Sequence, residues 1–286
     1  LAFCAAILYK LFCDKKVRLS QWCFYRLPGI ESERSFFHGL LKGLARRNVD
    51  HFISYTSYGE NYLKSIGVDS NNISVAVNVC DTTYWNKKYL ELEASNPTAE
   101  RIRKSEKLIV AFIGTLSAQK KPLMVLEVAE KMRHSNCEFF IAGSGELEGF
   151  MHAQILARKL DNVTMLGHLK EEIAELMHKV DLLFVPGRGG IAISESLCMG
   201  CPVIVHQGDG VELDLIDSPD VGNITRSASV DSFEDAIRGW FDSSRRYQST
   251  IACKRVIKKY DTQAMIDIFN LAFKKFDNKT DALNDC

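Results

Sequence analysis

The sequence lacks any excess of charge. Its 286 residues include 36 Lys and Arg and 36 Asp and Glu, so the formal net charge is zero. A protein that wraps nucleic acid carries a basic face, and the balanced charge therefore argues against nucleic acid as a partner. A membrane surface can be reached only through a local patch of charge.

A long hydrophobic run is also missing. Residues 1–13 are apolar, but Lys10 interrupts them and the stretch is too short to span a bilayer. It also lacks the charged start and the cleavage site of a signal peptide, so we expect a core helix. Because the chain begins without Met and in mid-helix, we expect further residues upstream, and we assign any peripheral membrane contact to that missing part.

Paired cysteines and metal-binding spacings are scarce as well. The nine cysteines are scattered and odd in number, which argues against a secreted disulfide framework and for the reducing cytoplasm. Cys198 and Cys201 have the spacing of a redox or zinc pair, but a second pair is lacking, so we expect two buried apolar side chains. No Asp-x-Asp pair ends a predicted strand, so we expect no metal. We expect no cofactor either.

The sequence does contain a regular alternation of strands and helices. Its length and its 46% of apolar residues indicate about two globular domains. Apolar strands alternate with amphipathic helices after Lys107, which predicts an α/β fold with a doubly wound parallel sheet. These predicted strands lie at 108–113, 138–142, 163–166, 181–185 and 203–206. Before them, strands at 17–25, 51–55 and 73–77 and helices at 35–47 and 58–66 predict a first α/β domain.

The domain boundary is expected in the polar segment 82–105. This gives a partial N-terminal domain at residues 1–95 and a second domain at 106–286. The second domain would end in three helices, at 231–241, 247–260 and 262–276. The last helix is amphipathic, and we expect it to pack partly on the first domain.

Glycine is concentrated at one edge of the predicted sheet. In a doubly wound sheet the ligand crevice lies outside the carboxyl ends of the strands. Glycine in the loops at those ends marks this edge as the site, although plain tight turns also use glycine. Nine of the 18 glycines fall in these loops: Gly114, Gly143, Gly145, Gly167, Gly187, Gly189, Gly190, Gly208 and Gly210.

Residues 185–202 form the central pattern of a strand, a glycine loop and a helix. A glycine loop that feeds a helix N-terminus offers N–H groups to an anion. Glu195 lies one turn inside the helix, and its side chain leans back toward the same spot. Since a carboxylate repels phosphate, the expected ligand carries hydroxyl groups beside its phosphates. An exposed helix glutamate and solvated lysines at 120 and 121 are the alternative interpretations.

Five segments resemble glycosyltransferase family 4. They are Phe-Ile-Gly-Thr-Leu at 112–116 followed by Lys120, Ile-Ala-Gly-Ser-Gly at 141–145, Leu-Gly-His-Leu at 166–169, the stretch 190–202, and Ala-Val-Asn-Val-Cys-Asp at 76–81. The resemblance implies the GT-B fold, with two Rossmann-like doubly wound parallel-sheet domains, of which the first is incomplete here. It also implies a retaining enzyme that uses nucleotide-sugar donors without a metal.

The resemblance also implies roles for single residues. Lys120 and Glu195 are the expected catalytic residues, one neutralising the diphosphate and the other holding ribose hydroxyls. Gly190 and Ile191 would offer backbone N–H groups to the diphosphate. The remaining expected substrate-binding residues are Gly114, Thr115, Gly143, Gly167, His168, Leu169 and Gly189, of which Gly143 and 167–169 would wall the base and its ribose.

Two positions depart from the family pattern. The family has Arg where Thr115 stands, and a first acidic residue where Gly187 stands. The first change removes a bidentate phosphate contact, and the second removes a group that clamps donor-sugar hydroxyls. Arg188 either compensates for the lost arginine or is simply solvated.

Taken with these observations, the resemblance implies a retaining, metal-independent hexosyltransferase of polysaccharide biosynthesis. It would move a sugar from a nucleotide-diphosphate sugar donor to a glycan or lipid-linked acceptor, in the cytoplasm or peripherally at the inner membrane. A nucleotide-sugar epimerase of similar fold and a non-catalytic sugar-nucleotide binding module are the alternatives.

Overall fold

The computed structural model describes residues 2–25, 43, 47–98, 100, 102, 107–206 and 208–284. The chain divides into two compact units: unit 1 is Leu1–Asn78 with Gln263–Cys286, and unit 2 is Val79–Thr262. The helix predicted at 35–47 lies almost entirely outside the described residues. Among the helices that are described, none combines the length and the apolar character needed to cross a membrane.

Unit 1 is built on a parallel sheet of order β1-β2-β3, in which Ser20 pairs with His51 and Phe52 with Ile73. The predicted strand at 51–55 and helix at 58–66 are confirmed, and Thr56 caps that helix. The elements of unit 1 are α1 (Ala2–Phe12), β1 (Ser20–Cys23), β2 (His51–Ser54), α3 (Ser57–Ser65), η1 (Ser70–Asn72), β3 (Ile73–Val75) and, from Gln263 on, α13 (Thr262–Asn284).

The sheet of unit 1 buries apolar side chains on both faces. Neighbouring strand residues point to opposite faces. Phe52 accordingly packs with Leu63 of α3 and with Ile73, whereas Ile53 packs with Ala272 of α13. The last helix of the chain therefore completes the core of unit 1.

Helix α1 forms as expected, but it is not a core helix. Ile7 is buried, while Leu8 and Phe12 are 54% and 82% exposed. Polar bonds hold the helix: Lys10 is paired with Asp50 and donates to the carbonyl of Asn48. Burial acts to raise the pKa of the Asp50 carboxyl, but bonds from Lys10 and from the backbone of Leu19 lower it overall.

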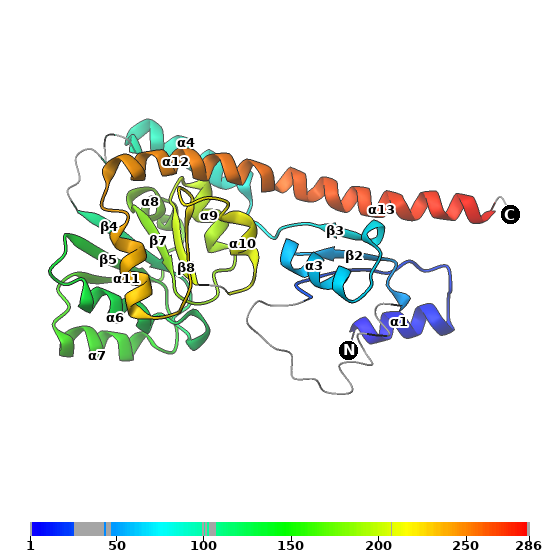
Figure 1. The fold of residues 1–286 in the computed structure, drawn as a ribbon, viewed down its shortest axis with the longest axis horizontal. Helices are drawn as coiled ribbons and strands as arrows, with labels where there is room; N and C mark the ends of the chain where they lie inside the picture. The colour runs from blue at the N-terminus through cyan, green and yellow to red at the C-terminus, as the bar shows by residue number, and fades with distance from the viewer. Residues whose placement is uncertain are drawn as a thin grey trace. The chain divides into compact units, whose positions relative to one another are not determined.

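Unit 2 contains a six-stranded, fully parallel sheet of order β6-β5-β4-β7-β8-β9 (Figure 1). The five strands expected after Lys107 are confirmed, and β9 is an additional edge strand. The elements of unit 2 are α4 (Thr82–Ser95), β4 (Leu108–Ile113), η2 (Ala118–Lys120), α6 (Leu123–Lys131), β5 (Cys137–Ala142), α7 (Glu148–Arg158), β6 (Val163–Gly167), α8 (Glu172–Lys179), β7 (Leu182–Val185), α9 (Ala192–Cys198), β8 (Val203–His206), α10 (Val211–Leu215), β9 (Gly222–Thr225), α11 (Val230–Arg238), α12 (Ser243–Ile257) and η3 (Lys258–Tyr260).

Helices cover both faces of this sheet. The face under α6, α7 and α11 forms the larger apolar core, in which Phe112, Phe139 and Trp240 are fully buried. Helices α8, α9 and α12 pack together with α4 in a second layer. A sheet buried on both faces explains why its strands read as continuous apolar runs.

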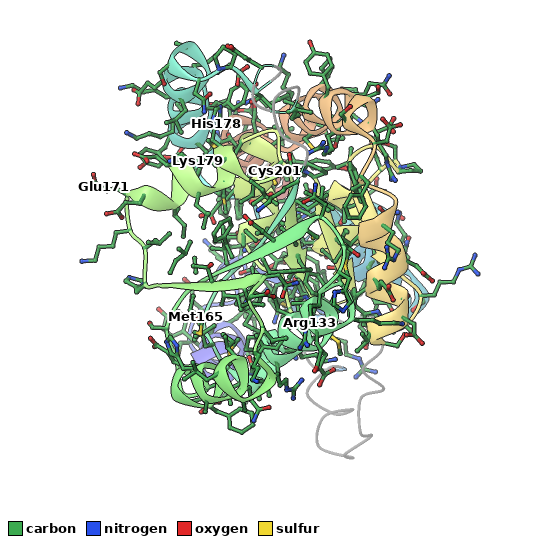
Figure 2. All side chains as sticks on the ribbon, turned by 90° about the vertical axis from the view of Figure 1, so that its left-hand side faces the viewer. Arg133, Met165, Glu171, His178, Lys179 and Cys201 are labelled. Atoms are coloured by element: carbon green, nitrogen blue, oxygen red, sulfur yellow. The ribbon has the colours of Figure 1, made fainter. Side chains whose placement is uncertain are left out.

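The boundary between the units differs from the expected linker at 82–105. Residues 82–95 form helix α4, which Asp81 caps by accepting bonds from the N–H groups of Thr83 and Tyr84. Glu93 of α4 lies 3.1 Å from the ring of His178, which Figure 2 shows on α8 next to Lys179. Because α4 is anchored to α8 in this way, it belongs to unit 2, and the division falls after Asn78.

Candidate functional site

The candidate site lies at the carboxyl ends of β4 and β7. The strand order reverses between these two neighbours, and ligands of doubly wound sheets bind at such a reversal. The loops that follow β4, β7 and β8 leave the sheet at this edge. They contain most of the residues that the sequence marked as functional.

Three of the predicted glycines line this edge in a row. Gly114 donates its N–H to the carbonyl of Ala142 at 3.0 Å, and Gly143 donates to the carbonyl of Gly167 at 2.7 Å. A Cβ at position 143 would lie only 1.9 Å from the carbonyl oxygen of Gly114. Glycine is therefore required at 143 by the close approach of two backbones.

Lys120 joins the loop after β4 to the glycine loop after β7. Its ammonium group donates to the carbonyl of Arg188 at 2.5 Å and to that of Gly189 at 3.2 Å. Burial lowers the pKa of this half-buried lysine, the nearby Asp209 carboxylate raises it in part, and Arg188 lowers it further. The structure thus brings together Lys120 and Gly189, two of the residues that the sequence analysis named for substrate binding.

Gly187 is a glycine for a structural reason. A Cβ at this position would lie 2.4 Å from the carbonyl oxygen of Gln119 and 2.6 Å from the carbonyl carbon of Lys120. The two loops therefore touch through their backbones, and an acidic side chain at position 187 does not fit this conformation.

Glu195 sits in the first turn of α9, between two side chains that face the core. Ile193 and Leu197 are fully buried, whereas Glu195 is partly exposed. Burial raises the pKa of its carboxyl group. The side chain is therefore not that of an ordinary solvated helix glutamate.

Groups that the sequence did not single out hold α9 in place. The Ser194 hydroxyl accepts the N–H of Cys80 at 2.9 Å, and Lys254 donates to the carbonyl of Cys198 at 2.7 Å. Burial lowers the pKa of Lys254 to about 8. Cys198 and Cys201 are both buried, as expected for apolar cysteines.

An unpredicted bond links the glycine loop to the loop after β8. The N–H of Gly190, where φ is +61°, donates to the carboxylate of Asp209 at 3.2 Å. The sequence left Asp209 and Glu212 open between ligand contact and helix capping. Glu212 accepts the N–H groups of Gly208 and Gly210 and so shapes this loop. Burial raises the pKa of Glu212.

Other predicted residues lie further from this junction. Gly167 ends the edge strand β6, and His168 and Leu169 follow it; β5 separates this strand from β4. Thr115 and Ile191 are exposed, and both lie in loops at the same edge of the sheet as Lys120. Among the described residues no three His, Cys, Asp or Glu side chains form a group that could hold a metal ion.

Several solved glycosyltransferase structures share this fold. Anabaena HepE in complex with UDP and glucose has a TM-score of 0.70 at 14% identity, over 96% of this chain and 75% of that one. A Staphylococcus aureus TarM mutant in complex with Fondaparinux, α-GlcNAc-glycerol and UDP has a TM-score of 0.69 at 15% identity, over 94% and 53%. A glycosyltransferase from Rickettsia africae has a TM-score of 0.71 at 13% identity, over 95% and 73%.

These similarities confirm the expected α/β fold of the GT-B class, with parallel sheets in two Rossmann-like domains. Among curated proteins no sequence matches this chain at a significant level. The model of the family described as "Glycosyl transferases group 1" matches residues 96–258, which is more than half of the sequence and nearly the whole of unit 2. The chain therefore belongs to the glycosyl transferases of group 1.

Proposed function

We propose that this protein is a retaining glycosyltransferase that moves a hexose-type sugar from a nucleotide-diphosphate sugar to a glycan or lipid-linked acceptor without a metal ion. The observation that carries this proposal is the junction of Lys120 with the glycine loop at the β4–β7 reversal. Structural neighbours that hold UDP and glucose, or UDP and a GlcNAc-glycerol, support a nucleotide-sugar donor and a glycan acceptor.

The residues have distinct parts in this reaction. When the acceptor hydroxyl displaces the nucleoside diphosphate, negative charge grows on the leaving phosphates, and the Lys120 ammonium stabilises it. An ammonium group has three donors, so the two carbonyl bonds recorded for Lys120 leave one for a phosphate oxygen. The N–H of Ile191 adds a second donor, whereas that of Gly190 is bonded to Asp209. Glu195 accepts bonds from the ribose hydroxyls.

We assign the donor to unit 2 and the acceptor to unit 1. Gly143 and residues 167–169 wall the base and its ribose, while Gly114, Thr115 and Gly189 line the phosphate side. We further propose that the enzyme acts in polysaccharide biosynthesis, in the cytoplasm or peripherally at the inner membrane. At the membrane it would meet lipid-linked acceptors directly.

The test uses the full chain, a panel of nucleotide sugars and a panel of glycan and lipid-linked acceptors. We expect acceptor-dependent release of nucleoside diphosphate, which chelator leaves unchanged. NMR of the first product formed should show that the transferred sugar has the same anomeric configuration as in the donor. An epimerised donor without transfer would establish the epimerase alternative, and binding without turnover would establish a binding module. Inverted configuration, or loss of transfer with chelator, would overturn the retaining or the metal-free assignment.

A further inference from the structure

Position 187 cannot supply the acid that the family resemblance places there. The backbone of residues 119–120 occupies the space that a side chain of residue 187 would need. A donor sugar still requires an acceptor for its hydroxyl groups, because hydroxyls buried in a closed cleft without partners cost free energy. Another element at the same edge of the sheet can supply such an acceptor.

The loop after β8 lies directly against residues 187 and 188. A Cβ at position 208 would lie 3.4 Å from the carbonyl oxygen of Gly187 and 3.3 Å from the Cα of Arg188. The next residue along this loop is Asp209. Its Oδ2 accepts the N–H of Gly190 at 3.2 Å, which places its carboxylate in the glycine loop itself.

Capping of α10 explains the hydrogen bond of only one of the two carboxylate oxygens of Asp209. The second oxygen, Oδ1, accepts the N–H of Val211 at 3.2 Å and fixes the start of α10. The bond from Oδ2 reaches a different loop and does nothing for α10. Asp209 is 6% exposed, and its charge acts on Lys120. The Asp209 side chain also interacts with that of Glu212 and, in addition to burial, acts to raise the pKa of the Glu212 carboxyl. Each carboxylate oxygen has two acceptor sites, so these three partners leave one for a sugar hydroxyl.

We propose that Asp209 is the carboxylate that binds a hydroxyl group of the donor sugar, in place of the acid missing at Gly187. The proposal rests on the function proposed above and assigns a specificity-determining residue to it. Glu195 and Asp209 then divide the hydroxyls between them, Glu195 binding the ribose and Asp209 the transferred sugar. Lys120 lies between the Asp209 carboxylate and the phosphates and reduces their repulsion.

The test compares affinities for a nucleotide sugar and for the nucleoside diphosphate without its sugar. Isothermal titration of the full chain first identifies the tightest-binding member of a panel that includes UDP-glucose. Asp209→Asn should leave the affinity for the matching nucleoside diphosphate equal or higher. The same variant should lower the affinity for the nucleotide sugar about 10- to 100-fold, as expected for a lost bond to a charged acceptor. Asp217→Asn is the control, because Asp217 pairs with Arg255 and Lys259 on an exposed surface.

The outcomes separate this inference from the proposed function. The decisive quantity is the affinity for the nucleotide sugar divided by the affinity for the nucleoside diphosphate. The role of Asp209 is overturned if this ratio is the same in wild type and Asp209→Asn. It is also overturned if the ratio is near one in wild type. A wild-type chain that binds neither nucleotide sugars nor nucleoside diphosphates overturns the proposed function itself. As a further check, donors that lack one sugar hydroxyl should bind wild type more weakly than the parent donor, whereas Asp209→Asn should no longer distinguish them.

Discussion

Lys120 holds the glycine loop in place and is proposed to bind the diphosphate, and replacing it distinguishes these two roles. Lys120→Met keeps the aliphatic stem and removes the ammonium group that bonds to the carbonyls of Arg188 and Gly189. The second bond, at 3.2 Å, is at the long limit for N–H···O, and Arg188 is exposed, so water can replace part of what is lost. We expect a loss of about 1–2 kcal/mol in stability, which lowers Tm by roughly 2–8 °C for a domain of this size.

The effect on ligand binding should be larger. A lost charge-assisted bond to a diphosphate predicts an affinity about 10- to 150-fold lower. Calorimetric titration with nucleoside diphosphate well below the Tm of the variant measures this loss separately from unfolding. Lys121→Met is the matched control, since it removes the same charge one residue away at an exposed position. A lower Tm with unchanged affinity would show that Lys120 only fastens the glycine loop.

Three further predictions concern neighbouring residues and metal. Gly187→Ala forces a Cβ against the backbone of residues 119–120 and should cost about 1–3 kcal/mol in chemical denaturation, whereas Gly149→Ala, in open space on α7, should cost nothing. Burial raises the pKa of Glu195, so ionisation of this group opposes folding. At pH 7 the Tm of Glu195→Gln should therefore be equal to or higher than that of wild type. This difference in Tm should shrink as the pH falls through the titration range of glutamate. The same variant should bind the donor more weakly, by roughly a kcal/mol or more. A variant that melts lower at neutral pH, or that binds donor as well as wild type, would contradict this. Chelator should leave transfer unchanged, and restoration of a lost rate by added divalent cation would contradict that.

The sequence predicted the sheet of unit 2 well because its strands are buried on both faces. Continuous apolar runs such as 108–113 and 182–185 are visible without any long-range information. Strand β9 was not predicted because its sequence, Gly-Asn-Ile-Thr, has little apolar character. It is held by pairing with β8, and a Cβ at position 222 would lie 2.2 Å from the carbonyl oxygen of Val203.

Helix α4 shows the opposite limit. Its residues are mostly polar, so its composition resembles that of a linker. Its stability comes from the Asp81 cap, from buried Trp85 and from the contact between Glu93 and His178, which is 85 residues away in sequence. Local patterns contain no information about that partner. The domain boundary was therefore expected too late in the chain.

Sequence patterns could indicate candidate site residues that are close in sequence, but not contacts between neighbouring loops. The glycine loop was singled out from its spacing and Lys120 from the family resemblance, and in the structure Lys120 donates to the carbonyls of Arg188 and Gly189 in that loop. The bond between Gly190 and Asp209 connects loops that follow two adjacent parallel strands, and no periodicity marks it. In a parallel sheet, adjacent strands deliver their carboxyl-end loops to the same place, so a group lost from one loop can be replaced from the next. Under the proposal for Asp209, the absence of an acid at Gly187 and the presence of one at Asp209 are a single feature, which can be seen only by comparing loops along the sheet edge.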